Sequence, residues 1–505
     1  MGRREGGRPV NDGANIPVRA PVKGSLTQER IGERKELAKE IRPHQLFTLG
    51  FGTIHGVGWI IVAGSWVVMA GALGAAIAFG IGALLFILIS LCYAEMGTMY
   101  PHSGGEVVYV HEAFGSAAGF LVGWLLALFY IAITSFEALA AAWIIEVLVP
   151  GHAGPVLYHL VGQDVHLAAV LLGLTGMLAL GYANYRGGGT AARFQDTMTL
   201  IFTLCSLFFI VAGITGGSST NAQPLIRADE SGSMWGGIIA VLVTTPAWYS
   251  GCNIIPQAMG ELVDLTKSNA LFVGLVSALV LSCLFYCGVI FSIAFAAPLE
   301  VLKSADLPVA GAMFAAFKSP WPARIVLTAG LFGIATAWNA MFFCAPRVLL
   351  ALSRAGTIPP AFSRIHKRHG SPSFAIVFVG IVGMIGVLAG RGVMMPIINT
   401  VGICLAASYL FVCLAVLRLR RRLPHAHRPY RVPWHPWLTW AAAIASLGIL
   451  VLALVQPWRN TTLPLPIEWL VLLCWGIFGF ICWRLARPMR AAMTEDERRA
   501  RIQRR

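Results

Sequence analysis

The chain has 505 residues, of which 57% are apolar and only 12% are charged. Soluble domains carry roughly 25% charged residues, so this composition excludes a disordered chain and argues against a soluble enzyme. Because one membrane-spanning helix needs about 20 apolar residues, we expect a polytopic helical membrane protein.

The chain begins with a polar, basic segment that lacks the short apolar region of a cleaved signal peptide. We interpret residues 1–45 as a cytoplasmic tail, mostly disordered. Twelve apolar runs follow, at about 46–71, 73–97, 114–149, 166–183, 197–215, 234–262, 270–297, 325–350, 373–390, 394–417, 436–456 and 466–486. Residues 487–505 form a second basic tail. An even number of spans places both termini on one side of the membrane.

Lysine and arginine predict which side that is. If the first tail is cytoplasmic, 32 of the 38 Lys and Arg residues fall in inner segments, including the basic loop at 418–435. The net charge of +15 is therefore interpreted as a topology signal, and not as a nucleic-acid-binding surface. We expect a multi-pass protein of the plasma (inner) membrane with both termini cytoplasmic.

Two of the twelve runs contain residues that interrupt a helix. The first run has GFGTIHGVGWI (50–60), and the sixth has WYSGCN (248–253) between two prolines. In a bilayer such breaks are tolerated where they line an enclosed site, although glycines also serve close helix packing. The breaks lie five spans apart, so the second unit enters the membrane from the opposite face. This is typical of an inverted repeat with a site at the membrane midplane.

Several longer motifs then occur in a fixed order. They are GTIHGVGWI, YAEMGTMYPHSGGEVVYVHEAFG (93–115), ARFQD (192–196), AWYSGCNIIPQAMGEL (247–262) and RVLLALSRAGTIPPAFSRIHKRHGSP (347–372). Over roughly residues 45–435 the ordered set resembles the amino acid–polyamine–organocation family. The resemblance implies an all-α fold of twelve transmembrane helices with the leucine-transporter-type five-plus-five inverted repeat (46–215 and 234–417) and two C-terminal helices (436–486). It also implies secondary transport of amino acids or related amines.

The resemblance assigns the two breaks to substrate binding, and helix physics makes this assignment sensible. A half-helix N-terminus offers amides and a positive dipole end to a carboxylate, while unwound carbonyls accept from an ammonium. The residues expected at the carboxylate are Gly56, Val57, Gly58 and Trp59. Those expected around the ammonium are Trp248, Tyr249, Ser250 and Gly251, and Asn253 is a further substrate-binding candidate.

The third span supplies another expected wall of the site. Tyr130, Thr134 and Glu137 are spaced i, i+4 and i+7, which places them on one helix face, and Phe129 is adjacent. The resemblance implies that this span faces the substrate around residues 129–134. An acid at membrane depth is a functional candidate, with a structural, hydrogen-bonded carboxyl as the alternative.

Proton coupling has two candidates, His55 and Glu137. A histidine titrates near neutral pH, but it could equally be neutral and donate to a backbone carbonyl. At the inner ends of spans 2 and 6, Glu95 and Glu261 are interpreted as gate or structural acids that bond loop backbone or arginine. Trp338 on span 8 is a further candidate for an aromatic lid.

The chain departs from the family pattern at several positions, including three in or near the expected site. Val57 stands where a Ser or Thr is usual, Asn253 where a Glu is frequent, and Phe202 where some members have a coupling lysine. Lysine-based coupling therefore cannot be carried over, and sodium is less favoured than a proton. The chain has no Gly-Lys dipeptide and hence no P-loop, and we expect no cofactor or metal.

The predicted function is amino acid transport by alternating access, with a proton as the co-transported ion. An antiporter that exchanges an amino acid for an amine is the first alternative, although Asn253 argues mildly against an acidic pocket. A channel or a membrane enzyme without alternating access is the alternative from another class. A substrate-sensing receptor is disfavoured because both tails are short for a signalling domain.

Overall fold

The computed structural model describes residues 37–152, 154–229, 232–251, 253–263, 270–305, 307–459 and 465–503. Most of the expected N-terminal tail lies outside these residues. Its last part is ordered, because Leu37 and Ile41 are buried and the first described helix already begins at Pro43.

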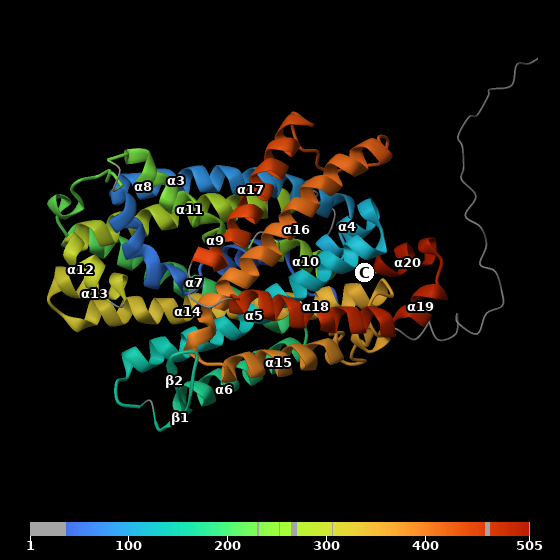
Figure 1. The fold of residues 1–505 in the computed structure, drawn as a ribbon, viewed down its shortest axis with the longest axis horizontal. Coiled ribbons are helices and arrows are strands. Elements are labelled where there is room, and N and C mark those ends of the chain that lie inside the picture. The colour runs from blue at the N-terminus through green and yellow to red at the C-terminus, as the bar shows by residue number, and fades with distance from the viewer. Residues whose placement is uncertain are drawn as a thin grey trace, which may run out of the picture. The chain divides into compact units, whose positions relative to one another are not determined.

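The first half of the described chain is helical except for one hairpin (Figure 1). Its helices are α2 (Pro43–Ile54), α3 (Gly58–Met99), α4 (Glu106–Phe114), α5 (Ser116–Leu148), α6 (Leu167–Tyr185), α7 (Gly188–Gly216) and the 3-10 helix η1 (Ser219–Ala222). The hairpin pairs β1 (Val156–Leu160) with β2 (Gln163–His166), antiparallel, with His159 opposite Asp164. The all-α expectation thus misses one small sheet, in a segment that was expected to be a loop.

The second half has the same helical character. It contains α8 (Met234–Leu242), α9 (Thr245–Trp248), α10 (Ile254–Ala258), η2 (Met259–Glu261), α11 (Ala270–Ala296), α12 (Leu299–Ser304), α13 (Pro308–Phe317), α14 (Pro320–Arg354), η3 (Pro360–Ser363), α15 (Ser373–Leu388), η4 (Arg391–Val393), α16 (Met394–Arg422), α17 (Trp437–Arg459), α18 (Ile467–Leu485), α19 (Arg487–Ala491) and α20 (Glu495–Ile502). The end of α16 occupies the first five residues of the expected 418–435 loop, and two helices occupy the expected C-terminal tail.

Within the described ranges, nine helices are long and apolar enough to cross a membrane, and three shorter apolar helices accompany them. The longest, α3, has 42 residues but contains Gly71 with a φ of 75° and a ψ of 168°. A side chain there would meet the carbonyl of Leu225, so glycine permits both the sharp bend and the close contact. The helix therefore consists of two segments. These observations describe an all-α, polytopic membrane protein.

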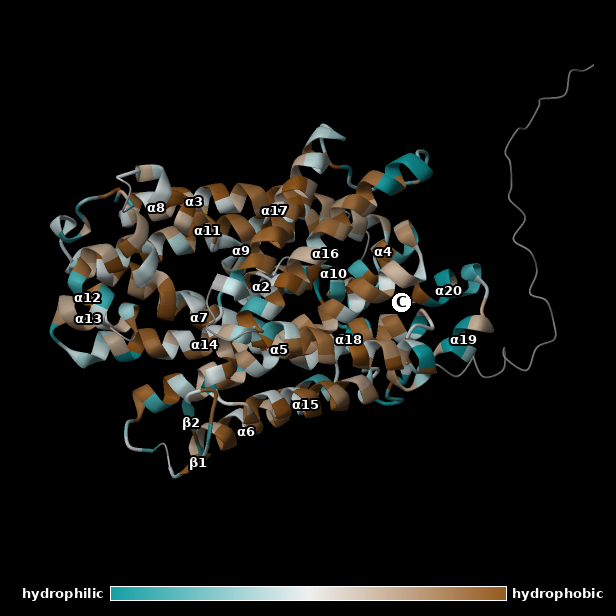
Figure 2. Ribbon diagram, in the orientation of Figure 1, coloured by the Kyte–Doolittle hydropathy of each residue, from teal (hydrophilic) through white to brown (hydrophobic). Residues whose placement is uncertain are grey.

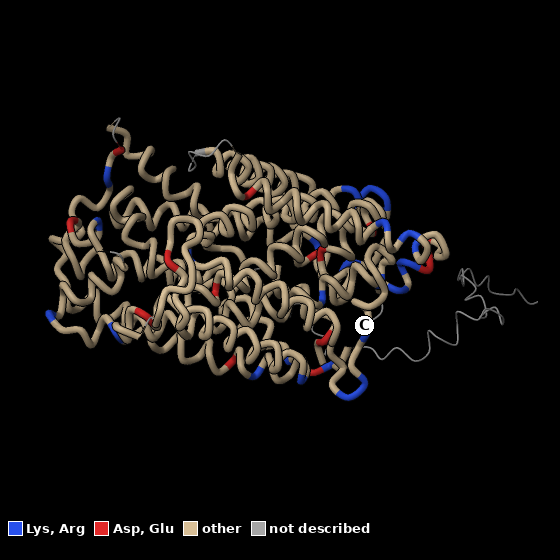
Figure 3. The backbone as a smooth tube through the Cα atoms, turned by 60° about the horizontal axis from the view of Figure 1, so that its bottom comes forward, with Lys and Arg blue, Asp and Glu red and all other residues tan. Residues whose placement is uncertain are grey.

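The long helices form one tightly packed bundle, with α14 against α5 and α7, and α11 against α3. Figure 2 shows apolar residues along these helices and polar residues on α19 and α20. Lysine and arginine gather at the end of the bundle that holds the C-terminus, as Figure 3 shows. This arrangement is the one expected if that end faces the cytoplasm.

Candidate functional site

A cavity of about 290 Å³ lies where the two expected breaks meet, between α5, α11, α14, α16 and α17. Eight of the residues singled out in the sequence line it: Gly56, Val57, Gly58, Trp59, Phe129, Glu137, Trp248 and Ser250. The remaining lining is largely apolar, with Ile133, Phe136, Met341 and Leu405 among the wall residues. The cavity is therefore suited to a small molecule with an apolar part.

The first break is present where the glycines predict it. Helix α2 ends at Ile54 and α3 begins at Gly58, so the intervening three residues are not helical. A Cβ added to Gly56 would lie 2.6 Å from Oε1 of Glu137, and one added to Gly58 would collide with the ring of Trp248. Glycine is thus required for the backbone to approach these two side chains. The first residues of α3, Gly58 and Trp59, line the cavity, and the amides of a helix's first turn lack an i−4 partner.

Glu137 is the acid that belongs to the cavity. Its side chain is 4% exposed, and its Oε2 has no hydrogen-bond partner. Among the described residues it takes part in no salt bridge. Burial of an unpaired carboxylate is costly. Glu137 is therefore favoured either as a neutral carboxylic acid or, if ionised, with a bound cation beside it.

The second break is held in place by side chains. Helix α9 ends at Trp248 and α10 begins at Ile254. The hydroxyl of Tyr249 donates to the carbonyl of Phe79 at 3.0 Å, and the Asn253 amide donates to the hydroxyl of Tyr130 at 2.7 Å. These side chains fasten the break to α3 and α5 and do not line the cavity.

Two further candidates from the sequence also lie outside the cavity lining. Gly251 has a φ of 148°, and a side chain there would meet Ile54 of α2, so this glycine permits contact between the two broken helices. Thr134 donates to the carbonyl of Tyr130 at 2.7 Å, on its own helix.

Tyr286 on α11 is a site residue that the sequence reasoning missed. It lines the cavity, and its hydroxyl lies 2.9 Å from the carbonyl of Ile54 and 3.1 Å from that of Trp248. These are the C-terminal carbonyls of the half-helices α2 and α9, so one hydroxyl serves both breaks. The only sequence signal was a polar hydroxyl within an apolar run.

His55 occupies an aromatic box beside the cavity. Its Nδ1 lies 2.6 Å from the carbonyl of Phe51, and its ring contacts those of Phe202, Phe285 and Tyr286. The residue is fully buried and does not line the cavity. This environment corresponds to the alternative of a neutral histidine that donates to the backbone.

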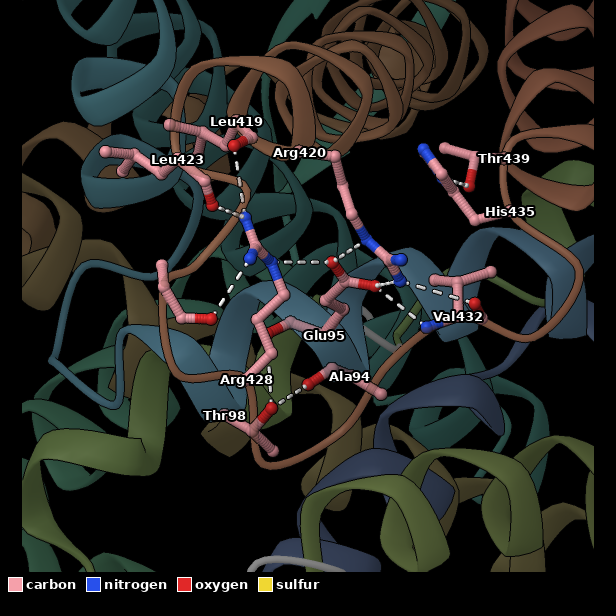
Figure 4. A network of polar contacts seen from close by, with 11 residues as sticks. Ala94, Glu95, Thr98, Leu419, Arg420, Leu423, Arg428, Val432, His435 and Thr439 are labelled. Atoms are coloured by element: carbon pink, nitrogen blue, oxygen red, sulfur yellow. Dashed lines mark hydrogen bonds and ion pairs between the residues drawn. The ribbon is translucent and has the colours of Figure 1, made fainter.

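Glu95 is paired at the basic end of the bundle (Figure 4). It accepts from Arg420 at 2.6 and 2.7 Å and from the amide of Val432 at 2.8 Å, and it lies 3.2 Å from Nε of Arg428. Two guanidinium groups and one amide thus surround a carboxylate that is 1% exposed. The group ties α3 to the end of α16 and the loop after it.

Glu261 has a comparable role on the second broken helix. It accepts from Nε and Nη2 of Arg347 at 2.5 and 2.9 Å, which joins η2 to α14. Its carbonyl accepts from the amides of Glu40 and Ile41, and Ile41 forms a parallel bridge with Leu262. The segment before α2 is thereby fixed to the end of η2, so the two broken helices are joined to each other at this end.

Span 8 contributes packing near the site. Trp338 does not line the cavity, and its ring lies against Gly176 of α6. Thr336 donates to the carbonyl of Gly52 at 2.8 Å, so α14 supports the first half-helix.

Comparisons with known proteins show the family of the chain. The family model described as "Amino acid permease" matches residues 41–480. A branched-chain amino acid permease of Bacillus subtilis is 25% identical, over 83% of this chain and 88% of the relative. A methylthioribose transporter of the same organism is 26% identical, over 89% and 94%. A gamma-aminobutyric acid permease, again of this organism, is 25% identical, over 85% and 90%. These relatives are transporters and not enzymes, and the chain belongs to the amino acid permease family, within the amino acid–polyamine–organocation group.

Proposed function

We propose that the protein is a proton-coupled amino acid symporter of the plasma membrane that works by alternating access. In this proposal twelve spans form a five-plus-five inverted repeat with two further helices, and both termini are cytoplasmic. The gathering of basic residues at one end of the bundle supports this orientation.

The observation that carries the proposal is the position of Glu137 at the first break. Its carboxyl lies beside Gly56, next to the amides expected to receive the substrate carboxylate. Two carboxylates cannot share such a site unless one is neutralised, because like charges at short distance repel strongly in a low dielectric. A proton on Glu137 therefore favours amino acid binding, and this makes substrate and proton binding cooperative.

The rest of the substrate has partners of matching chemistry. The ammonium is placed at the carbonyls of Ile54 and Trp248, whose positions Tyr286 maintains. The side chain extends into the apolar region near Ile133, Phe136 and Leu405. We therefore expect neutral amino acids with apolar side chains to bind best.

The alternative of an amine-exchanging antiporter predicts the opposite pH dependence. An ionised Glu137 would bind the ammonium of an amine that has no carboxylate, so the affinity for amines would rise with pH. Amino acid affinity would instead fall as pH rises. A thermal-shift screen of amino acids and amines at pH 5.5 and 8 separates the two proposals, since a bound ligand stabilises the folded protein by mass action.

Transport itself is tested in proteoliposomes. We expect an inwardly directed proton gradient, with the outside more acidic than the lumen, to drive accumulation of a neutral amino acid in the wild type. In Glu137→Gln, a permanent mimic of the neutral acid, binding should become independent of pH and the gradient should no longer drive accumulation, while exchange of labelled for unlabelled substrate continues. Saturable uptake that ignores the pH gradient in the wild type would contradict proton coupling.

A further inference from the structure

A second buried carboxyl without a cation lies at the inner end, on Glu106. This residue is the first of α4 and is fully buried. The only amide that donates to it from another helix within the described residues is Nε2 of Gln257, at 2.5 Å to its Oε2. Gln257 belongs to α10, the inner half of the second broken helix.

The groups that face Glu106 are neutral at physiological pH. They are Tyr93 on α3, Tyr109 on α4 itself, Tyr130 on α5, Gln257 on α10 and Cys344 on α14. The nearby guanidinium of Arg347 is engaged by Glu261, and none of the ion pairs in the described ranges includes Glu106. Burial raises the pKa of Glu106 to about 8, against the opposing effect of its hydrogen bonds. The carboxyl is therefore neutral at pH 7 as long as the site stays closed.

The segment around Glu106 is the surface on which α10 and η2 rest. A Cβ on Gly105, whose φ is 38°, would lie 3.1 Å from both Nε2 of Gln257 and Cβ of Pro256. A Cβ on Gly260 would lie 2.6 Å from the amide nitrogen of Ser103. The two backbones thus meet with no room for a side chain. A small outward movement of α10 would break this contact and admit water to the carboxyl.

We propose that Glu106 is a proton-binding site of the inner gate, which closes only when this carboxyl carries a proton. When α10 moves away from the 103–106 segment, the O–H bond of the carboxyl breaks and the proton passes to cytoplasmic water. Reclosure requires a proton from that water, because an ionised carboxylate has no cation to meet in the closed state. Cytoplasmic pH thereby sets how often the gate is open.

This inference extends the proposed alternating access but does not depend on Glu137 or on the identity of the substrate. It is tested on the purified full-length protein by hydrogen–deuterium exchange of the 253–263 segment between pH 6 and 9.5. After correction for the intrinsic pH dependence of exchange, we expect protection to fall about tenfold per pH unit up to about pH 8, because opening in this range releases one proton from Glu106. Above about pH 8 the carboxyl is ionised in the closed state as well, so the protection should level off.

The variants locate the proton. In Glu106→Gln the protection should be the same at both ends of the pH range. The matched control, Glu112→Gln, alters an acid on the same helix whose partners are Arg499 and Gln503, and it should leave the wild-type profile intact. In Gln257→Leu, loss of a hydrogen bond that lowers the pKa of Glu106 should move the pH at which the protection levels off to a higher value.

The outcomes are distinct from those of the transport experiments. A pH-independent wild-type profile, or an unchanged profile in Glu106→Gln, would overturn the assignment even if proton-driven uptake is confirmed. If the wild-type profile is as expected and uptake proves independent of the pH gradient, the gate site stands and the symport proposal fails. Should Glu106→Gln not fold, the wild-type slope and the shift in Gln257→Leu still decide the matter.

Discussion

Four of the buried carboxyls of this protein fall into two regions with opposite surroundings. At the basic end, Glu95 and Glu261 are each bound by arginine, and they join helices that are far apart in the sequence. Glu106, beside the inner half of the second broken helix, and Glu137, at the cavity, are also buried, but neither takes part in an ion pair in the described part of the chain. Burying a carboxylate costs free energy in both regions. In the first an arginine offsets this cost, whereas in the second a proton on the carboxyl can do so.

The contrast assigns different roles to acids that look alike in the sequence. An arginine-bound carboxylate remains charged and holds its neighbours together, so its loss should appear as a loss of stability. A carboxyl without a cation contributes little to stability as a charge, and its loss should appear as a change in pH dependence. The following predictions test this division, beginning with the largest expected effect.

The paired region is tested by Glu261→Gln. This change leaves the guanidinium of Arg347, whose side chain is 1% exposed, buried without its anion. We expect a loss of about 3–5 kcal/mol in the free energy of unfolding, the usual cost of removing one partner of a buried pair. The measurement is thermal or denaturant unfolding in detergent.

Two controls sharpen this result. The double variant Glu261→Gln/Arg347→Met removes the unpaired charge and should recover most of the stability. Glu146→Gln breaks the pair with Arg391, in which both side chains are 31% exposed and the charged atoms are 3.8 Å apart, and it should cost less than about 1 kcal/mol. Equal losses in Glu261→Gln and Glu146→Gln would show that burial does not distinguish the two pairs.

The cavity is tested by a pair of glycine variants. In Gly56→Ala the new Cβ would lie 2.6 Å from Oε1 of Glu137, so it displaces this carboxyl and narrows the approach to the α3 amides. Gly402→Ala is the matched control, because Gly402 also lines the cavity but has no atom within 4 Å of the added Cβ. We expect at least a tenfold loss of substrate affinity, about 1.4 kcal/mol, in the first variant only. Similar substrate affinities in both variants would show that the substrate carboxylate does not bind at the first break.

Much of the fold could be predicted from the sequence, because apolar runs and helix-breaking glycines are local signals. The run at 114–149 became α5 (Ser116–Leu148), and both breaks occur at the predicted residues. The β-hairpin at 156–166 was missed, since two short exposed strands carry little periodic signal.

The candidate site was less predictable, because side-chain partners depend on helices far apart in the sequence. Span counting could not reveal that Tyr130 and Asn253 bind each other, or that Tyr286 contacts both breaks. Glu106 lies inside a motif that was recognised, but its lack of a cation becomes visible only when α10 is placed against α4. Prediction from the sequence therefore located the region and left the roles of its acids open.

The smallest expected effect concerns the hydroxyl that joins the two breaks. Tyr286→Phe removes the donor shared by the carbonyls of Ile54 and Trp248, and a hydroxyl can donate to only one of them at a time. We expect a stability loss of about 1 kcal/mol and a several-fold rise in KM for uptake. Tyr249→Phe is the control, because its hydroxyl donates to Phe79 away from the cavity and its removal should cost similar stability while KM stays unchanged. If both variants alter KM equally, the tyrosines act through general packing of the bundle, and the alignment of the two breaks does not depend on Tyr286.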